Sequence, residues 1–245
     1  MCTGEFQLVY LGYSFASDVL LFRMPIVQPF RFDPLVNRTR RPLTDALQSL
    51  CEALVLAVSR VLDIDIREMN AGYRPIRYGD DQFADIFLYD TLSGGAGYAT
   101  QAGQVFQEVF AQAESLLGQC DCDSSCVKCL RHYGNRFHHV SLDRFLALDL
   151  VRFIKEGRSP EVFERSRQQA ELRPLVQMLM LEGWQVSGEG EAPIIATRAG
   201  RSVSLWAYPS LVDPQALGFT KSAAAYAFSP YELSRDLPGA FAEVT

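Results

Sequence analysis

The sequence lacks the segments that mark membrane, secreted and motor proteins. No run of about 18 uncharged apolar residues occurs, which excludes a transmembrane helix. The first residues, MCTGEFQLVY, have neither the basic start nor the long apolar run of a secretory signal. No G-x-x-x-x-G-K-[ST] phosphate loop is present, and 245 residues are too few for two nucleotide-handling lobes. We therefore expect a cytoplasmic protein that makes no contact with a membrane and is not itself an enzyme or a helicase motor.

Positive charge is also scarce. Lys and Arg number 23 against 29 Asp and Glu, so the formal net charge is −6. A protein that binds nucleic acid through bulk positive charge is therefore excluded, and any such contact must come from a local patch. Hydrophobic residues make up 48% of the chain and charged residues 21%, which is the balance of a packed globular protein.

Cysteine is rare outside one short segment, CDCDSSCVKC. This segment holds four of the six cysteines: Cys120, Cys122, Cys126 and Cys129. A disulfide framework would spread its cysteines to close long loops, whereas these close almost nothing. Four thiolates in one tight loop suit a tetrahedral metal site, and we expect a closed, structural Zn²⁺ site rather than an iron–sulfur cluster, whose spacing differs. The alternative is a set of reduced thiols, or one redox pair with two bystanders.

Hydrophobic periodicity predicts how the first part of the chain folds. Short runs rich in aliphatic and aromatic residues predict strands at 6–13, 17–24 and 84–89. Apolar residues at every third or fourth position predict a helix at 43–62, another after a glycine loop, and a third over 141–156 with Ser141 as its N-cap. Cys51 lies inside the first helix and is expected to be a core residue. The prediction is a mixed α/β zinc-binding domain with the four-cysteine loop between two helices.

A domain boundary is predicted near Gly157, which ends the third helix. Residues 1–157 would form the zinc-binding domain, and residues 158–245 a small α+β C-terminal appendage. Ser159-Pro160-Glu161 predicts a further helix start, and 175–182 a short helix of its own. Three strands are predicted in the appendage, at 184–186, 193–197 and 202–208. The chain as a whole is thus expected to belong to the α+β class.

The glycine loop SGGAGY joins a predicted strand to a predicted helix. Backbone amides at a helix N-terminus bind anions and glycine lets a phosphate come close, so Gly94, Gly95 and Gly97 are candidate phosphate-binding residues. The spacing is not G-x-G-x-x-G, and the alternative is a tight turn that needs positive φ. The sequence leaves both interpretations open.

The segment after the cysteines, LRHYGNRFHH followed by LDR, interleaves cations with aromatic residues. Its candidate nucleic-acid-binding residues are Lys128, Arg131, Arg136, His139 and Arg144. A Zn²⁺ with four thiolates is itself negatively charged, and Asp121 and Asp123 add to this, so the local field is mixed. The alternative is that Arg131, Asn135 and Arg144 brace the loop as donors to sulfur. Both roles can coexist.

Together these motifs resemble a known family. SDVLLFR, YDTLSGGAGY and the pattern C-x-C-x₃-C-x₂-CLRHYGN…H…LDR are similar to the MrfA-type zinc-binding (MZB) domain over about residues 6–157. That domain is the C-terminal domain of bacterial DEAD/DEAH-box helicases and of DrmB-like defence proteins. The resemblance implies zinc held by the four cysteines, and a role in DNA repair or antiviral defence.

The resemblance also implies a partner, because the motor domains of such helicases are absent from the sequence. The chain would act with a separate DEAD/DEAH-box motor, or as the tail of a split helicase whose N-terminal part is missing. The leading hypothesis is a non-catalytic zinc-binding module that assists a superfamily 2 helicase on DNA. The alternative is a zinc-stabilised protein-interaction scaffold in a defence or repair complex, without direct contact to nucleic acid.

Overall fold

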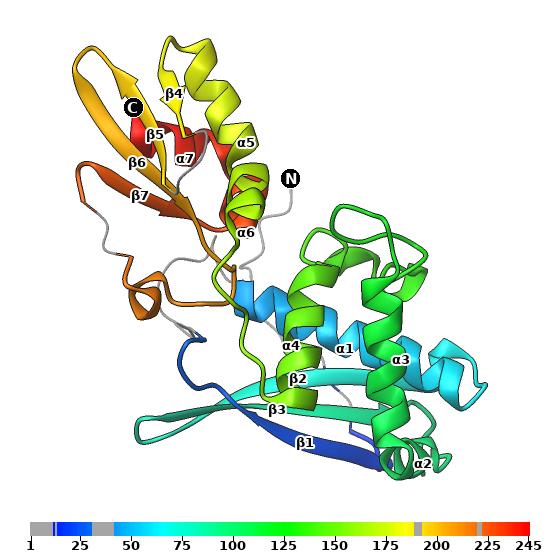
Figure 1. Cartoon of the computed structure of the whole chain (residues 1–245). Helices are drawn as coiled ribbons and strands as arrows, with labels where there is room; N and C mark the ends of the chain where they lie inside the picture. Colours follow the sequence, from blue (N-terminus) through cyan, green and yellow to red (C-terminus); the bar gives the residue numbers. More distant parts are fainter. Residues whose placement is uncertain (1–11, 13, 31–41, 189–192, 220–221) are drawn as a thin grey trace, which may run out of the picture.

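In the part of the chain that the structure describes, two sheets, each packed against helices, enclose separate hydrophobic cores (Figure 1). The computed structural model describes residues 12, 14–30, 42–188, 193–219 and 222–245. Helices and strands are mixed along these residues, as the α+β prediction requires. None of the helices in this part of the chain combines the length and the apolar character that crossing a bilayer demands.

The first sheet has three antiparallel strands in the order β1-β3-β2. Their bounds are Val19–Pro25 for β1, Met69–Tyr78 for β2 and Asp81–Asp90 for β3. The predicted strands at 17–24 and 84–89 are thereby confirmed, while the one at 6–13 lies outside the described residues. The sequence did not predict β2, because Pro75 interrupts its pattern. An edge strand tolerates that proline.

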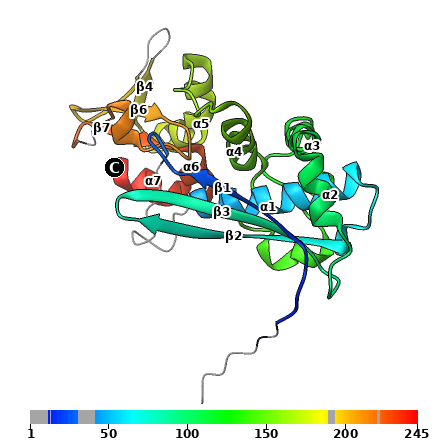
Figure 2. The ribbon, with the colours of Figure 1, turned by 90° about the horizontal axis from the view of Figure 1, so that it is seen from below.

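One face of this sheet is turned toward the helices. Ile86 and Leu88 on the central strand are 0% and 1% exposed, and the register sets Phe22 opposite Ile86 on that same face. Figures 1 and 2 show the covering helices, which are α1 Pro42–Val61, α2 Tyr98–Gln104, α3 Phe106–Gly118 and α4 Arg144–Glu156. Side chains alternate between the two faces of a strand, so the face that carries Ile86 and Leu88 sets where the first core lies.

The α1 helix lies at the centre of the first core and confirms the helix predicted at 43–62. Its apolar stripe is fully buried at Leu47, Leu50 and Leu54. Cys51 is 2% exposed, as predicted for a core residue, and burial raises the pKa of its thiol. A thiol in this environment stays protonated and unreactive.

The second sheet has four strands in the order β4-β5-β6-β7, of which the last pair is parallel. Its strands are β4 Gln185–Ser187, β5 Ile194–Arg198, β6 Arg201–Ala207 and β7 Ala225–Phe228. The helices with it are α5 Arg165–Leu181, α6 Pro230–Arg235 and α7 Leu237–Val244. The three strands predicted here are confirmed, whereas β7, α6 and α7 were not predicted.

The C-terminal part of the chain returns to the first core. Leu211 and Tyr231 are buried in the cluster built around α1. The Tyr231 hydroxyl donates to Asp45 Oδ2 at 2.7 Å, which joins α6 to the first turn of α1. These contacts connect the C-terminal part of the chain to the first core. The domain boundary near Gly157 therefore stays a prediction.

Two helix boundaries in the first core differ from the predictions. The helix after the glycine loop is broken at Val105, where φ is −109° and ψ 29°. The break brings the ring of Phe106 to 5.3 Å from that of Phe22 on β1, measured between centroids. The N-cap of α4 is Asp143 and not Ser141, because the Asp143 carboxylate accepts from two amides of the first turn.

After Gly157 the predicted helix starts were wrong, although 175–181 are helical as predicted. No helix starts at Ser159-Pro160-Glu161, and the segment 175–182 is the second half of the single helix α5. Pro174 lies inside α5, although proline removes a helical hydrogen bond. Leu172, Leu175 and Leu179 are 0% exposed on one side of this helix. Their burial outweighs the cost of the proline.

Candidate metal centre

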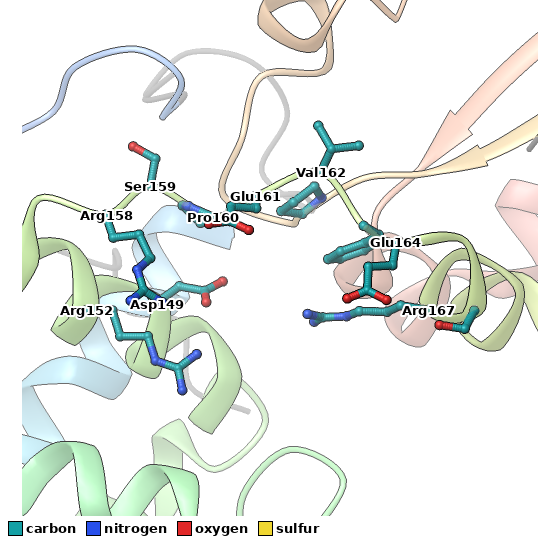
Figure 3. A pocket seen from close by; sticks show the side chains of 12 residues that line it. Asp149, Arg152, Arg158, Ser159, Pro160, Glu161, Val162, Glu164 and Arg167 are labelled. Atoms are coloured by element: carbon teal, nitrogen blue, oxygen red, sulfur yellow. The ribbon is translucent and has the colours of Figure 1, made fainter.

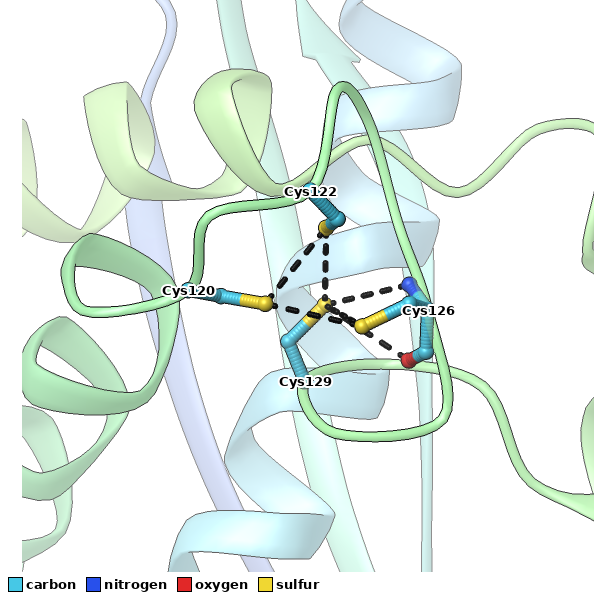
Figure 4. Close-up of side chains that lie close together, drawn as sticks. All are labelled: Cys120, Cys122, Cys126 and Cys129. Atoms are coloured by element: carbon cyan, nitrogen blue, oxygen red, sulfur yellow. Dashed lines mark hydrogen bonds between the residues drawn. The ribbon is translucent and has the colours of Figure 1, made fainter.

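The four clustered cysteines converge in the loop between α3 and α4 (Figure 4). Their Sγ atoms all lie within 4.8 Å of one another. Cys129 is fully buried and the other three are half-buried, so the cluster lies at the margin of the first core. Four soft donors in one place form a site that suits a metal ion.

The spacing of the sulfur atoms fits tetrahedral coordination. Zinc–sulfur bonds of about 2.3 Å in a regular tetrahedron place the sulfurs about 3.8 Å apart. The measured separations are 3.5 Å for Cys120–Cys122, 3.5 Å for Cys120–Cys126, 3.7 Å for Cys122–Cys129 and 3.9 Å for Cys126–Cys129. A disulfide would need about 2.05 Å, so the geometry fits a shared ion better than a redox pair.

Backbone amides of the loop point at two of the sulfurs. The amide of Cys126 lies 3.3 Å from Cys129 Sγ, and the amide of Lys128 lies 3.4 Å from Cys126 Sγ. The Lys128 amide is the largest influence that lowers the pKa of Cys126 to about 7. Such amide donors stabilise thiolates, which are the ligand form of cysteine.

Arg144 braces the loop from the start of α4. The side chain is buried, and its guanidinium donates to the carbonyl oxygens of Cys122 at 2.8 Å and Leu117 at 2.9 Å. The Arg144 amide donates to Ser124 O at 2.7 Å. Arg144 thus has a bracing role, but through backbone carbonyls and not through donation to sulfur as predicted.

Asn135 and Glu52 fix the next segment to α1. This segment contains the 3₁₀ helix η2, Tyr133–His138. Asn135 Nδ2 donates to Glu52 Oε2 at 2.9 Å and to Leu130 O at 2.8 Å. His132 Nε2 lies 3.0 Å from the same Glu52 oxygen. Glu52 was not among the residues predicted from the sequence, because only the tertiary structure brings α1 beside this segment.

The candidate nucleic-acid-binding residues differ in their accessibility. Lys128 and Arg136 are exposed, while Arg131 is half-buried and donates to Ser125 Oγ at 2.9 Å. His139 is half-buried, with Nε2 2.9 Å from Asn135 Oδ1. Together with the buried Arg144, these positions leave Lys128 and Arg136 as the cations most open to a ligand.

The glycine loop uses its amides within the chain. Three of its glycines have positive φ, at 95° for Gly94, 79° for Gly95 and 82° for Gly97. The Asp90 carboxylate, which is fully buried, accepts from the amides of Ala96 at 2.6 Å, Tyr98 at 3.1 Å and Ala99 at 2.8 Å. A Cβ at Gly95 would lie 2.5 Å from Asp18 Oδ2. Of the candidate glycines, Gly94 and Gly95 donate their amides to Ala16 O at 2.8 Å and Leu92 O at 3.0 Å, so the chain itself takes up amides that were candidates to hold a phosphate.

A separate cavity of about 370 Å³ lies beside α4 and the segment that leads into α5 (Figure 3). Its charged lining holds three acidic and three basic side chains, which are Asp149, Arg152, Arg158, Glu161, Glu164 and Arg167. Burial raises the pKa of Asp149 to about 6. Because the charges nearly balance, this cavity shows no preference for an anion or a cation.

A closed four-cysteine centre at the edge of an α+β core defines a metal-binding module. Residues 50–130, which include all four clustered cysteines, match the model of the MrfA Zn-binding domain (MZB) family. The Druantia protein DruE of Escherichia coli (strain UMEA 4076-1) is 38% identical over 251 residues, which cover 98% of this chain and 14% of DruE. The chain thus spans about one seventh of that relative.

Two crystal structures of the DUF1998 helicase MrfA also match parts of this chain. The structure bound to DNA is 20% identical, with a TM-score of 0.36 over 50% of this chain and 16% of MrfA. The structure bound to DNA and AMPPNP is 22% identical, with a TM-score of 0.32 over 40% of this chain and 14% of MrfA.

Proposed function

We propose that this chain is a zinc-stabilised, helicase-associated module that assists a superfamily 2 helicase on DNA, in repair or in antiviral defence. The observation that carries the proposal is the near-tetrahedral sulfur cluster inside a segment of the MrfA Zn-binding family. Its ligands would be Cys120, Cys122, Cys126 and Cys129. Bound zinc would act as a structural cross-link, because four protein ligands leave no open position for a reacting water.

The chain's own residues would make the metal loop a DNA-facing element. Arg144 and Asn135 hold the loop on α4 and α1, and Lys128 and Arg136 project from it. Cations on a fixed loop can contact phosphates with little loss of backbone conformational entropy on binding. In this proposal the module positions DNA, and a separate motor hydrolyses the nucleotide.

The motor would be supplied in trans or by the remainder of a longer protein. The second possibility is supported by DruE, of which this chain spans 14%. Within the chain, residues 1–157 would form the zinc-binding module and residues 158–245 an appendage. The contact between Tyr231 and Asp45 would hold the appendage against the module.

Elemental analysis with matched cysteine variants tests the metal assignment. The purified chain should contain one zinc per molecule, and Cys126→Ala should lose it. Cys51→Ala is the matched control, since Cys51 is buried in α1 away from the cluster, and it should keep its zinc. Zinc kept at full stoichiometry by Cys126→Ala would refute the ligand assignment.

A second candidate function is a protein-interaction scaffold in a defence or repair complex. Two exposed aliphatic side chains favour it, Val127 at 82% and Val140 at 73% exposure, both near the metal loop. A salt titration separates the two functions. DNA affinity that falls steeply with salt supports the DNA module. Association with a DEAD/DEAH-box motor without any DNA binding by the chain supports the scaffold.

A further inference from the structure

The 3₁₀ helix η2 buries a polar side chain and exposes its aromatic ones. Asn135 is 3% exposed, whereas Tyr133 and Phe137 are 82% and 78% exposed. Surface elements ordinarily present polar side chains to water and apolar ones to the core. Large apolar side chains that are gathered and this exposed mark interaction sites.

The guanidinium of Arg136 lies over both rings. Its guanidinium carbon is 4.6 Å from the centroid of Tyr133 and 4.3 Å from that of Phe137. The same guanidinium donates to the carbonyl oxygen of Tyr133 at 3.3 Å. The two distances from the guanidinium to the ring centroids fall within the range of cation–π attraction. This attraction favours one arrangement of the three side chains. We call Tyr133, Arg136 and Phe137 the stacking platform.

The backbone beneath the stacking platform is held in place by buried polar contacts. Asn135 Oδ1 accepts from the amide of His132 at 2.9 Å, and its Nδ2 reaches Glu52 and Leu130. These bonds run between η2, α1 and the end of the cysteine loop. The platform is therefore formed before any ligand arrives, so little conformational entropy is lost on binding.

The segment that carries the platform has charges of one sign, while the Glu52 carboxylate of α1 beneath it bonds to Asn135 and lies beside His132. Residues 124–142 contain Lys128, Arg131 and Arg136 and no Asp or Glu at all. Acidic residues flank this stretch at Asp121, Asp123 and Asp143. A ligand that fits must therefore combine negative charge with flat apolar surfaces. Nucleic acid has both, as phosphates for the cations and bases for the rings.

We infer that the stacking platform binds unpaired bases of single-stranded DNA, with Tyr133 and Phe137 stacking on bases and Arg136 contacting the backbone. In a duplex the faces of each base are covered by the neighbouring base pairs, so exposed rings can stack only on an open strand. This inference rests on the proposed DNA-assisting function and specifies the DNA form. The platform would hold a strand that a motor has just separated.

The experiment measures the affinity of the full 245-residue chain for a fluorescent oligothymidylate of about 20 nucleotides. Tyr133→Ala combined with Phe137→Ala should weaken binding by about tenfold or more for each ring, and Tyr133→Phe should bind as the unchanged chain does. Leu181→Ala is the matched control, because Leu181 is an equally exposed apolar side chain, at 87%, at the end of α5. Zinc content and unfolding midpoint should be the same in all four proteins.

Salt dependence distinguishes the platform's two kinds of contact. Arg136→Ala should lower the affinity. It should also reduce the magnitude of the slope of log affinity against log salt by about 1, which corresponds to one phosphate contact. The double aromatic variant should lower the affinity and leave the slope unchanged, since rings neutralise no phosphate. A blunt-ended duplex of the same length should bind more weakly than the single strand.

Four outcomes would overturn the inference. An unchanged affinity of the double aromatic variant removes the platform but leaves the proposed DNA function standing. Failure of the unchanged chain to bind any DNA at low salt removes both. Loss of association with a motor protein, at unchanged DNA affinity, assigns the rings to protein docking. Binding of oligouridylate at least tenfold tighter than oligothymidylate assigns them to RNA.

Discussion

Arg144 and Leu117 join the two helices that flank the metal loop. The Arg144 guanidinium donates to the carbonyl oxygen of Leu117 at 2.9 Å, from the first residue of α4 to the last turn of α3. A cation near a helix C-terminus satisfies carbonyls that have no partner in the helix and opposes the negative end of its dipole. One side chain therefore sets the distance that the cysteine loop must span.

We expect Arg144→Ala to lower the free energy of unfolding by about 2–4 kcal/mol, because it leaves the carbonyls of Leu117 and Cys122 without their buried donor. Urea denaturation measures this change. Arg152→Ala is the control, since Arg152 is 43% exposed and pairs with Glu114 at 3.6 Å, so its loss should cost less than about 1 kcal/mol. Equal effects of the two substitutions would contradict the bracing role of Arg144.

Removal of the metal should loosen the loop and leave the helical core folded. Treatment with a chelator should raise hydrogen exchange at the amides of residues 120–139, because their order depends on the cross-link between sulfurs. The amides of α1 around Leu50 and Leu54, which are fully buried, should stay protected. Exchange in the loop that is the same with and without chelator would show that the metal has no structural role.

Asp90→Asn should destabilise the turn between β3 and α2. The Asp90 carboxylate accepts from three amides, and an asparagine would turn an NH₂ group toward at least one of those donors. We expect a loss of about 2–3 kcal/mol in the free energy of unfolding. Asp81→Asn, at the exposed end of the same strand, should leave the stability nearly unchanged. The same loss in both variants would refute the turn assignment.

Asp149→Asn should stabilise the chain above neutral pH. Burial raises the pKa of Asp149 from 3.8 to about 6, so the folded chain holds this proton more tightly than the unfolded chain. The contribution of Asp149 to stability therefore falls as pH rises between about 4 and 6, and stays low above. The variant should exceed the unchanged chain by up to about 3 kcal/mol at pH 8 and match it near pH 4.

Urea denaturation at both pH values tests this expectation, with Asp80→Asn in the exposed β2–β3 turn as the control. A stability difference between Asp149→Asn and the unchanged chain that is independent of pH would count against the burial of a charge at Asp149.

Local sequence determined the elements whose signal lies within the element itself. Leu47, Leu50 and Leu54 follow the helical period and mark the buried face of α1, which therefore needed no distant information. The four cysteines lie within ten residues, so a metal site that they form together depends only on local sequence. The prediction of a metal cluster thus followed from spacing alone, while the identity of the ion stays a prediction.

Contacts between distant residues decided what the sequence left open or predicted wrongly. The sequence predicted a separate short helix at 175–182, whereas α5 runs through Pro174 and buries Leu172, Leu175 and Leu179. Asp90 took the amides of the glycine loop, which depends on how β3 meets α2. Arg144 turned toward backbone carbonyls because α3 and α4 pack side by side.

The sequence by itself thus determined the fold class, the central helix and the four-cysteine cluster, because each depends on residues close together in the chain. Only the tertiary structure decided which polar side chains are buried and which rings are exposed. Asn135 and Tyr133 are two residues apart, yet one is buried against Glu52 of α1 and the other reaches solvent. The reason is physical, since burial depends on the elements packed against a residue, and those come from distant parts of the chain.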